Sequence, residues 1–213
     1  ERHLKTWSGS TLNRALRPDN EYAKMGQFNN LVISLCALFI SGCATTTTVR
    51  LQLPPLETVA YVDLQRYAGT WYEIANYPQR FQRGCTATTA TYILREDGEV
   101  DVVNRCRKGT IDGPEDSARG RARVVDGRSN AKLEVSFFRP FWGDYWIIDL
   151  GKEYDYAVVG HPSRDYLWIL SRTPTMDESI YEDILERLRD RGYQLDRLQK
   201  TLQRKTASNN DLK

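Results

Sequence analysis

Residues 69–76, Gly69-Thr70-Trp71-Tyr72-Glu73-Ile74-Ala75-Asn76, are the stretch on which the fold assignment rests. The stretch is short and rich in aromatic residues, and breakers and turn residues follow it, which indicates a β-strand. Seven similar runs follow, separated by turns such as Asp126-Gly127 and His161-Pro162. The eight predicted strands are Gly69–Asn76, Thr86–Leu94, Glu99–Arg105, Ala118–Val125, Lys132–Phe138, Asp144–Leu150, Asp155–Gly160 and Tyr166–Arg172.

The spacing of these runs favours one all-β architecture. Eight consecutive strands, about a dozen residues apart, predict an eight-stranded antiparallel up-and-down β-barrel rather than a Greek-key sandwich. A barrel of this size encloses an interior that side chains fill or that holds one small ligand. A membrane-spanning barrel would need apolar outward faces, and the predicted outward positions carry charges at Arg95, Glu99, Asp101, Arg121 and Arg123.

One helix is expected after the last strand, packed on the outside of the barrel. Thr175 followed by Glu178 matches a capping box, and Gly192 marks the end of the helix. The segment from Gln203 onward is polar and is expected to fray. The apolar face of the helix consists of Ile180, Ile184, Leu185 and Leu188.

The charge balance gives no support for nucleic-acid binding. The chain has 30 basic and 28 acidic residues, a net charge of +2, and this excess lies before Cys43. From Cys43 onward there are 25 residues of each sign. A neutral domain of this kind suits a neutral or mixed ligand better than a polyanion.

The N-terminal part of the chain looks like an export signal. Leu31–Ile40 is an apolar run of ten residues, too short to cross a bilayer but suited to the core of a signal peptide. Ile40-Ser41-Gly42-Cys43 resembles the bacterial lipobox, in which the cysteine is lipidated; the alternative is a buried apolar element. The expected organisation is an uncertain extension at 1–24, a signal peptide at 25–42, a tether at 43–60, a barrel domain at 61–203 and a disordered tail at 204–213.

Several motifs resemble the lipocalin family, over about residues 61–200. Gly69-Thr70-Trp71 is similar to the family's Gly-x-Trp signature, Asp155-Tyr156 to its second motif, and Tyr166–Pro174 to its third. Val135–Phe141 resembles the bacterial subgroup, which is related to apolipoprotein D. The resemblance implies structural roles for Gly69, Trp71 and Arg172, with the Arg172 guanidinium over the indole ring at the closed end of the barrel.

Alternation along the strands predicts which side chains face the interior. If Trp71 points inward, so do Glu73 and Ala75, and Trp168 and Leu170 do the same on the last strand. Glu73 either bonds to neighbours at the floor of the barrel, the favoured interpretation, or meets a polar ligand group. Each inward residue could instead be solid core. The predicted ligand-binding residues are Glu73, Tyr92, Val102, Asn104, Phe137, Tyr145 and Trp168.

Cys85 and Cys106 flank the predicted second hairpin, with a small offset. Antiparallel pairing brings them near one another, and export favours a disulfide over two free thiols. No Cys-x-x-Cys motif occurs, so no metal site is predicted, and no catalytic residue is identified. Phe138, Phe141 and Trp142 are expected to form an exposed rim patch that admits lipid, touches a membrane or contacts a second copy of the chain.

The sequence has no Gly-x-Ser-x-Gly motif, no phosphate loop and no nucleophile–base pair, so a binding protein rather than an enzyme is expected, with no cofactor. The resemblance implies a fatty acid, a lysophospholipid or a similar amphiphile as cargo, stored or transported in the cell envelope. The expected location is the bacterial outer membrane, facing the periplasm, with the membrane reached through Cys43. Two other functions remain open: a structural envelope lipoprotein with a filled barrel, and an enzyme built on the same fold.

Overall fold

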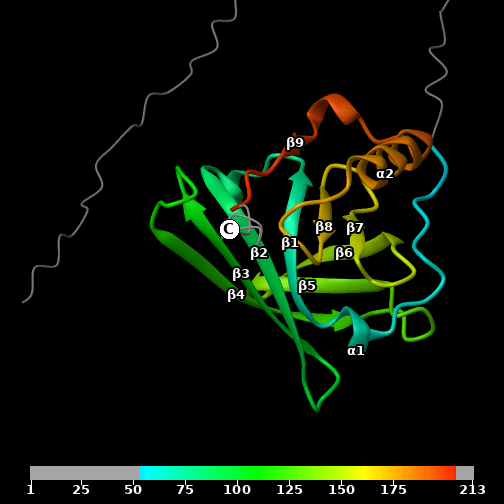
Figure 1. Cartoon of the computed structure of the whole chain (residues 1–213). Coiled ribbons are helices and arrows are strands. Elements are labelled where there is room, and N and C mark those ends of the chain that lie inside the picture. Colours follow the sequence, from blue (N-terminus) through cyan, green and yellow to red (C-terminus); the bar gives the residue numbers. More distant parts are fainter. Residues whose placement is uncertain (1–52, 205–213) are drawn as a thin grey trace, which may run out of the picture. The chain divides into compact units, whose positions relative to one another are not determined.

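The computed structural model describes residues 53–204 (Figure 1). Cys43, the predicted leader, the first part of the predicted tether and the tail from residue 205 lie outside the described residues. Within residues 53–204, no helix is both long and apolar enough to cross a bilayer.

The described strands form one closed sheet. Each strand from β1 to β7 pairs antiparallel with the next, and β8 returns to pair with β1, which closes the barrel; β9 adds to β1. This confirms the predicted eight-stranded up-and-down barrel. The strands are β1 (Gly69–Asn76), β2 (Cys85–Leu94), β3 (Val100–Lys108), β4 (Glu115–Val124), β5 (Lys132–Phe138), β6 (Phe141–Leu150), β7 (Tyr156–Gly160), β8 (Leu167–Ser171) and the short added strand β9 (Gln199–Lys200).

The connections between strands alternate between two ends of the barrel. The end that carries α1 (Leu64–Tyr67), which precedes β1, is here called the closed end; α1 lies at the bottom of Figure 1. Its loops are residues 95–99, 125–131 and 151–155. The opposite, open end carries loops 77–84, 109–114, 139–140 and 161–166.

Two apolar clusters lie on either side of the barrel wall. The inner cluster contains Trp71, Val102 and Leu170, whereas the outer cluster joins the wall to α2 (Glu178–Asp190). On β8 the neighbouring residues Ile169 and Leu170 contribute to different clusters, as alternation along a strand requires.

A bulge changes the orientation predicted for Ala75. The register between β1 and β8 shifts between Glu73 and Ala75, so that Ala75 pairs with Ile169 and packs in the outer cluster. The prediction that Ala75 faces the interior with Trp71 was therefore wrong, because the extra residue of a bulge reverses the alternation that follows it.

The main helix begins later than its sequence suggested. Asp177, not Thr175, is the N-cap, because its carboxylate accepts a hydrogen bond from the backbone N–H of Ser179 at 2.8 Å. Glu178 is then the first helical residue, too early to complete a capping box. Gly192 does end the helix: its φ of +81° lets Tyr193 N–H reach the carbonyl of Leu188 at 3.0 Å.

Both ends of the described chain are packed. Leu56, in the predicted tether, is 6% exposed and belongs to the outer cluster. At the other end, Gln203 donates hydrogen bonds to the carbonyls of Glu73 and Thr88, and Arg204 binds Asp112. The expectation that the chain frays from Gln203 was wrong for these two residues, because their side chains bind backbone and loop groups of the barrel.

Candidate ligand-binding site

Arg172 closes one end of the barrel together with Trp71. Its guanidinium carbon lies 3.8 Å from the centre of the fully buried Trp71 ring, and its nitrogens donate hydrogen bonds to four backbone carbonyls around α1, β1 and the β6–β7 loop. Gly69 has a φ of +98°, and a Cβ placed there would lie 3.3 Å from the guanidinium. A side chain at position 69 would therefore crowd this contact.

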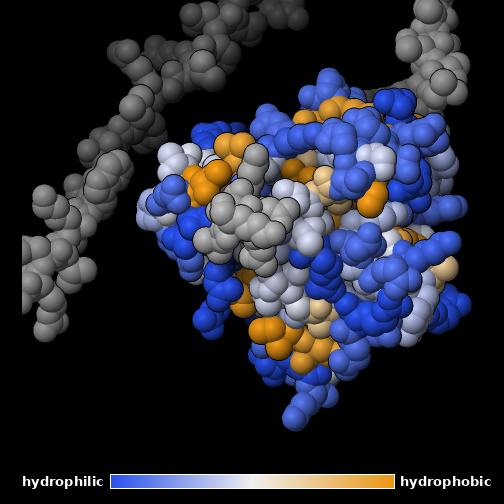
Figure 2. Space-filling model, viewed as in Figure 1, coloured by the Kyte–Doolittle hydropathy of each residue, from blue (hydrophilic) through white to orange (hydrophobic). Residues whose placement is uncertain are grey.

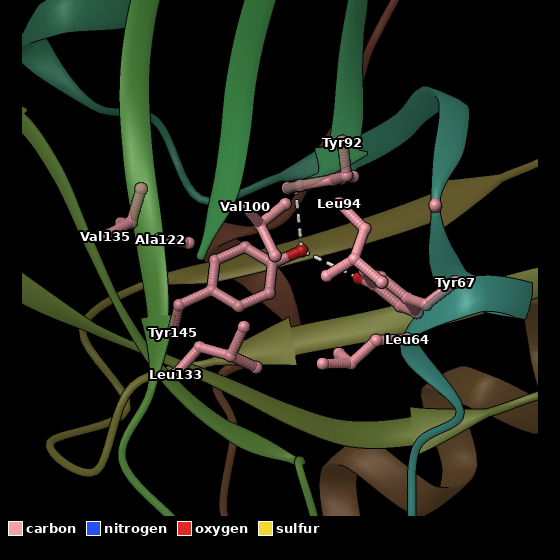
Figure 3. A pocket seen from close by; sticks show the side chains of 10 residues that line it. Leu64, Tyr67, Tyr92, Leu94, Val100, Ala122, Leu133, Val135 and Tyr145 are labelled. Carbon is pink, nitrogen blue, oxygen red and sulfur yellow. Dashed lines mark hydrogen bonds between the residues drawn. The ribbon is translucent and has the colours of Figure 1, made fainter. Parts of the chain in front are cut away.

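Three tyrosine hydroxyls meet inside the closed half of the barrel. The Tyr145 hydroxyl lies 2.7 Å from that of Tyr67 and 2.8 Å from that of Tyr92 (Figure 3). Each hydroxyl has one proton to donate, and the three hydroxyls make two hydrogen bonds with one another. One O–H group therefore has no acceptor among these three tyrosines. Burial raises the pKa of Tyr92 to about 12 and raises the pKa of the other two well above the usual value.

An apolar cavity borders these hydroxyls. Its free volume is about 20 Å³, which is room for about one water-sized group. Tyr92 and Tyr145 thus act mainly as packing in this structure. The lining residues are Leu64, Tyr67, Ala68, Tyr92, Leu94, Val100, Ala122, Leu133, Val135 and Tyr145 (Figure 3).

Glu73 is a buried carboxylate that holds several segments together. It is 3% exposed and accepts hydrogen bonds from Asn76 at 2.6 Å, Gln82 at 2.7 Å and Thr201 at 2.6 Å. Gln82 lies in η1 (Arg80–Gln82) of the β1–β2 loop, and Thr201 follows β9. Glu73 does bond to neighbours, as favoured from the sequence, but they come from the open-end side and not from the floor.

Trp168 joins the same network from β8. Its indole N–H donates to the Gln82 side-chain oxygen at 2.9 Å, and its ring stacks on Tyr166 with 6.1 Å between centres. The ring is only partly buried. Trp168 and Glu73 are thus joined through Gln82, a residue of an open-end loop that the sequence analysis did not single out.

Four strand side chains each bury a polar atom that has no hydrogen-bond partner within residues 53–204: Thr88 Oγ1, Asn104 Oδ1, Ser136 Oγ and Trp146 Nε1. Asn104 pairs with Ala90, a residue packed against the inner cluster, so its side chain shares the inward face, as predicted. Val102, two residues earlier, is 2% exposed and is part of that cluster. A buried acceptor without a partner lowers the free energy of unfolding by about 1–3 kcal/mol, so its presence in a folded protein needs an explanation.

Phe137 lies apart from the other predicted ligand-binding residues. The register between β5 and β6 shifts between Val135 and Phe138, and Phe137 is 41% exposed and outside both apolar clusters. The Phe137 ring lies against Gly120, where an added Cβ would come within 2.8 Å of it. Its ring borders a solvent-open cavity of about 480 Å³ where β4 and β5 separate, which also contacts Arg119, Gly120 and Arg139.

Cys85 and Cys106 form a disulfide between β2 and β3, near the open end. Within the described residues, no three His, Cys, Asp or Glu side chains are placed to hold a metal ion.

Several contributors to the site were missed because their sequence signals are short. Tyr67 lies in a four-residue helix, Gln82 in a three-residue 3₁₀ helix, and Thr201 beyond a two-residue strand. Periodicity needs longer segments than these to be detected. The only available signal was Asp63 ahead of α1, which caps this helix by accepting from Gln65 and Arg66 N–H.

Comparison with known proteins decides the family. The model of the "Lipocalin-like domain" matches residues 62–203. The chain belongs to the lipocalin family. It is 41% identical to "Outer membrane lipoprotein Blc" of Citrobacter freundii over 76% of this chain and 89% of the relative, and 31% identical to apolipoprotein D of Mus musculus over 65% and 76%. Insecticyanin from Manduca sexta has the same fold, with a TM-score of 0.57, 18% identity and coverage of 70% and 85%.

These relatives place this lipocalin among bacterial outer-membrane lipoproteins, because proteins named "Outer membrane lipoprotein Blc" from three bacterial species match it at 37–42% identity. Membership of the family implies a hydrophobic ligand. Lipocalins are generally binding or transport proteins rather than enzymes.

Proposed function

We propose that this lipocalin is anchored to the membrane through Cys43 and binds a fatty acid or lysophospholipid inside its barrel, for lipid storage or transport in the cell envelope. It would face the periplasm. The proposed ligand-binding residues are Glu73, Tyr92, Val102, Asn104, Tyr145 and Trp168, with Phe137 beside the opening.

The observation that carries this proposal is the unpartnered Asn104 Oδ1 on the inner wall. Polar groups of this kind fix a ligand within an otherwise apolar pocket. The Tyr67–Tyr145–Tyr92 hydroxyls supply the complementary group, a spare O–H donor, within the same barrel. Together they match a cargo that is mostly hydrocarbon and carries a few polar atoms.

A cargo of this size needs the interior to rearrange, because the cavity at the closed half holds about 20 Å³. Two changes would provide the room: rotation of Tyr92 and Tyr145, and movement of Gln82 with the β1–β2 loop. The Gln82 side chain binds Glu73 and Trp168, its backbone N–H donates to the Gln79 carbonyl, and the residue lies in a short 3₁₀ helix with no buried residue. Loops with so few buried contacts open at low free-energy cost.

The same small volume favours a second candidate, a structural envelope lipoprotein with a filled barrel. In that case Asn104 and the tyrosine hydroxyls are only parts of the wall. The two functions differ in whether a soluble amphiphile binds.

Titration of the full-length protein with palmitate and with a lysophospholipid separates them. A carrier changes the tryptophan fluorescence in a saturable way, and Trp168→Phe removes most of this change. Asn104→Val weakens binding by roughly 5–100-fold, because a hydrogen bond to a buried group is lost, and it also raises the free energy of unfolding. Val103→Ala, on the opposite face of β3, leaves binding unchanged. Absence of any saturable change establishes the filled barrel.

The anchor is tested separately. A Cys43→Ser variant expressed in a bacterium with a lipoprotein pathway is expected to leave the outer-membrane fraction, because several acyl chains are needed for stable anchoring. Retention of this variant in the outer membrane contradicts the assignment of Cys43.

A further inference from the structure

The two ends of the barrel differ in charge. The four open-end loops carry four arginines and two aspartates, and both aspartates lie within ion-pair distance of Arg204 or Arg197. The three closed-end loops carry six acidic and three basic residues. The open end therefore presents positive charge and the closed end negative charge.

Large apolar side chains are exposed on the positively charged end. Phe81 is 67% exposed in the β1–β2 loop, Phe138 and Phe141 are 78% and 72% exposed around Arg139-Pro140, and Leu202 is 64% exposed beyond β9. The phenylalanines come from two loops at the open end of the barrel, and Leu202 lies beside Ala87 of β2, whose N–H donates to its carbonyl. Together with Arg80, Arg83 and Arg139 they are here called the rim surface.

The arginines of the rim surface lie next to its phenylalanines in the sequence. Arg80 and Arg83 flank Phe81, and Arg139 lies between Phe138 and Phe141. None of the three forms an ion pair with another residue of the part described, 53–204. Arg139 also lines the open cavity between β4 and β5, beside Phe137 and Arg119.

Apolar exposure alone would not single out this end. On the face shown in Figure 2, hydrophilic residues predominate and small apolar groups lie toward both the upper and the lower end of the barrel. At the closed end, Ile93 is 51% exposed and Val125 is 50% exposed. Among residues 53–204, exposed phenylalanines interleaved with arginines that form no ion pair occur only at the open end, a combination that suits a surface with an apolar interior and anionic headgroups.

We propose that the rim surface docks onto a membrane that contains anionic phospholipid, with the three phenylalanines entering the headgroup boundary and the arginines contacting phosphates. This inference rests on the proposed function, since it gives a lipid cargo a direct route between the membrane and the open end. The acyl anchor at Cys43 would hold the protein near the membrane, and the rim surface would set which end faces it.

Vesicle binding tests this inference. All proteins are full-length and carry Cys43→Ser, so that acylation does not contribute and the N-terminal segment is the same in each. Binding is measured to vesicles of phosphatidylcholine alone and to vesicles that also contain phosphatidylglycerol. The rim variant is Phe138→Ser/Phe141→Ser, and the matched control is Ile93→Ser/Val125→Ser, which removes similar exposed apolar area at the closed end.

The rim variant is expected to bind the anionic vesicles about tenfold or more weaker, given the apolar area that two phenylalanines bury. Arg80→Gln/Arg83→Gln/Arg139→Gln is expected to lose binding to the anionic vesicles only, and salt should reduce wild-type binding. The control pair should bind as the wild type does.

Equal loss in the rim and control variants, or no loss in the rim variant, overturns the proposal. A rim variant that changes the oligomeric state but not vesicle binding assigns the surface to a second copy of the chain and also overturns it. Palmitate titration of the same proteins checks folding and tests the cargo independently, because a free fatty acid needs no membrane docking.

Discussion

At the residue scale, Arg172 shows how one side chain can seal an end of a barrel. It covers the Trp71 ring at 3.8 Å and binds the carbonyls of Arg66, Tyr67, Thr70 and Tyr154. Arg172→Gln is expected to lower the free energy of unfolding by about 2–3 kcal/mol, the sum of a cation–π contact and some of these hydrogen bonds. Urea denaturation measures this loss. The control is Arg119→Gln, at an exposed site, which should change the free energy of unfolding little. Equal effects would contradict the sealing role.

The buried tyrosine hydroxyls predict an alkaline loss of stability. Burial raises the pKa of Tyr92 from 10.0 to about 12 and raises the pKa of Tyr67 and Tyr145 well above that usual value. The folded state therefore keeps protons that the unfolded state loses, so this contribution is complete below pH 10 and falls as the pH rises toward 12 and beyond. Denaturation across this range should show the decline, and a Tyr92→Phe variant should show less of it.

The residues whose orientation sequence reasoning predicted correctly lie where neighbouring strands pair regularly. Trp71, Val102 and Asn104 lie on regular, paired parts of their strands, where alternation decides which side faces in. Ala75 follows a bulge, and the regular alternation of a strand cannot predict where a bulge reverses it. The position of Arg172 was predicted from the resemblance, but two of its four carbonyl contacts are to the short helix α1, which the sequence analysis did not predict.

At the scale of elements, Glu73 connects β1, the β1–β2 loop and the segment after β9. It is the shared acceptor of Asn76, Gln82 and Thr201. Glu73→Gln removes the charge and one acceptor, so the loop and the C-terminal segment should open more often, with a stability loss of about 1–3 kcal/mol. Hydrogen exchange should quicken at residues 80–82 and 199–203. Glu99→Gln, at the closed end, is the control; unchanged exchange in the Glu73 variant would contradict this role.

The strands and the main helix could be predicted because each repeats its pattern over many residues. The last described residues could not, since Gln203 and Arg204 resemble polar tail residues in the sequence. They are ordered only because the barrel offers the carbonyls of Glu73 and Thr88 and the carboxylate of Asp112 as partners. Such partners belong to the tertiary structure and leave no local signal.

At the scale of the whole molecule, the order of the strands accounts for the closed barrel and the helix outside it. The same order determines which loops lie at each end of the barrel, and so the difference in charge between the two ends. The free volume inside does not follow from this order, because it depends on the rotamers of Tyr67, Tyr92 and Tyr145, which turn toward each other and fill the closed half. The fold is therefore consistent with both a carrier and a filled barrel, and direct detection of a bound molecule distinguishes them.

Native mass spectrometry of the full-length protein, isolated from the outer membrane without added lipid, tests the central claim most directly. The account predicts one amphiphile of fatty-acid or lysophospholipid mass per chain, released on unfolding and bound again when palmitate is added. A bare chain mass that stays unchanged after palmitate is added would contradict the claim that this lipocalin carries lipid in its barrel.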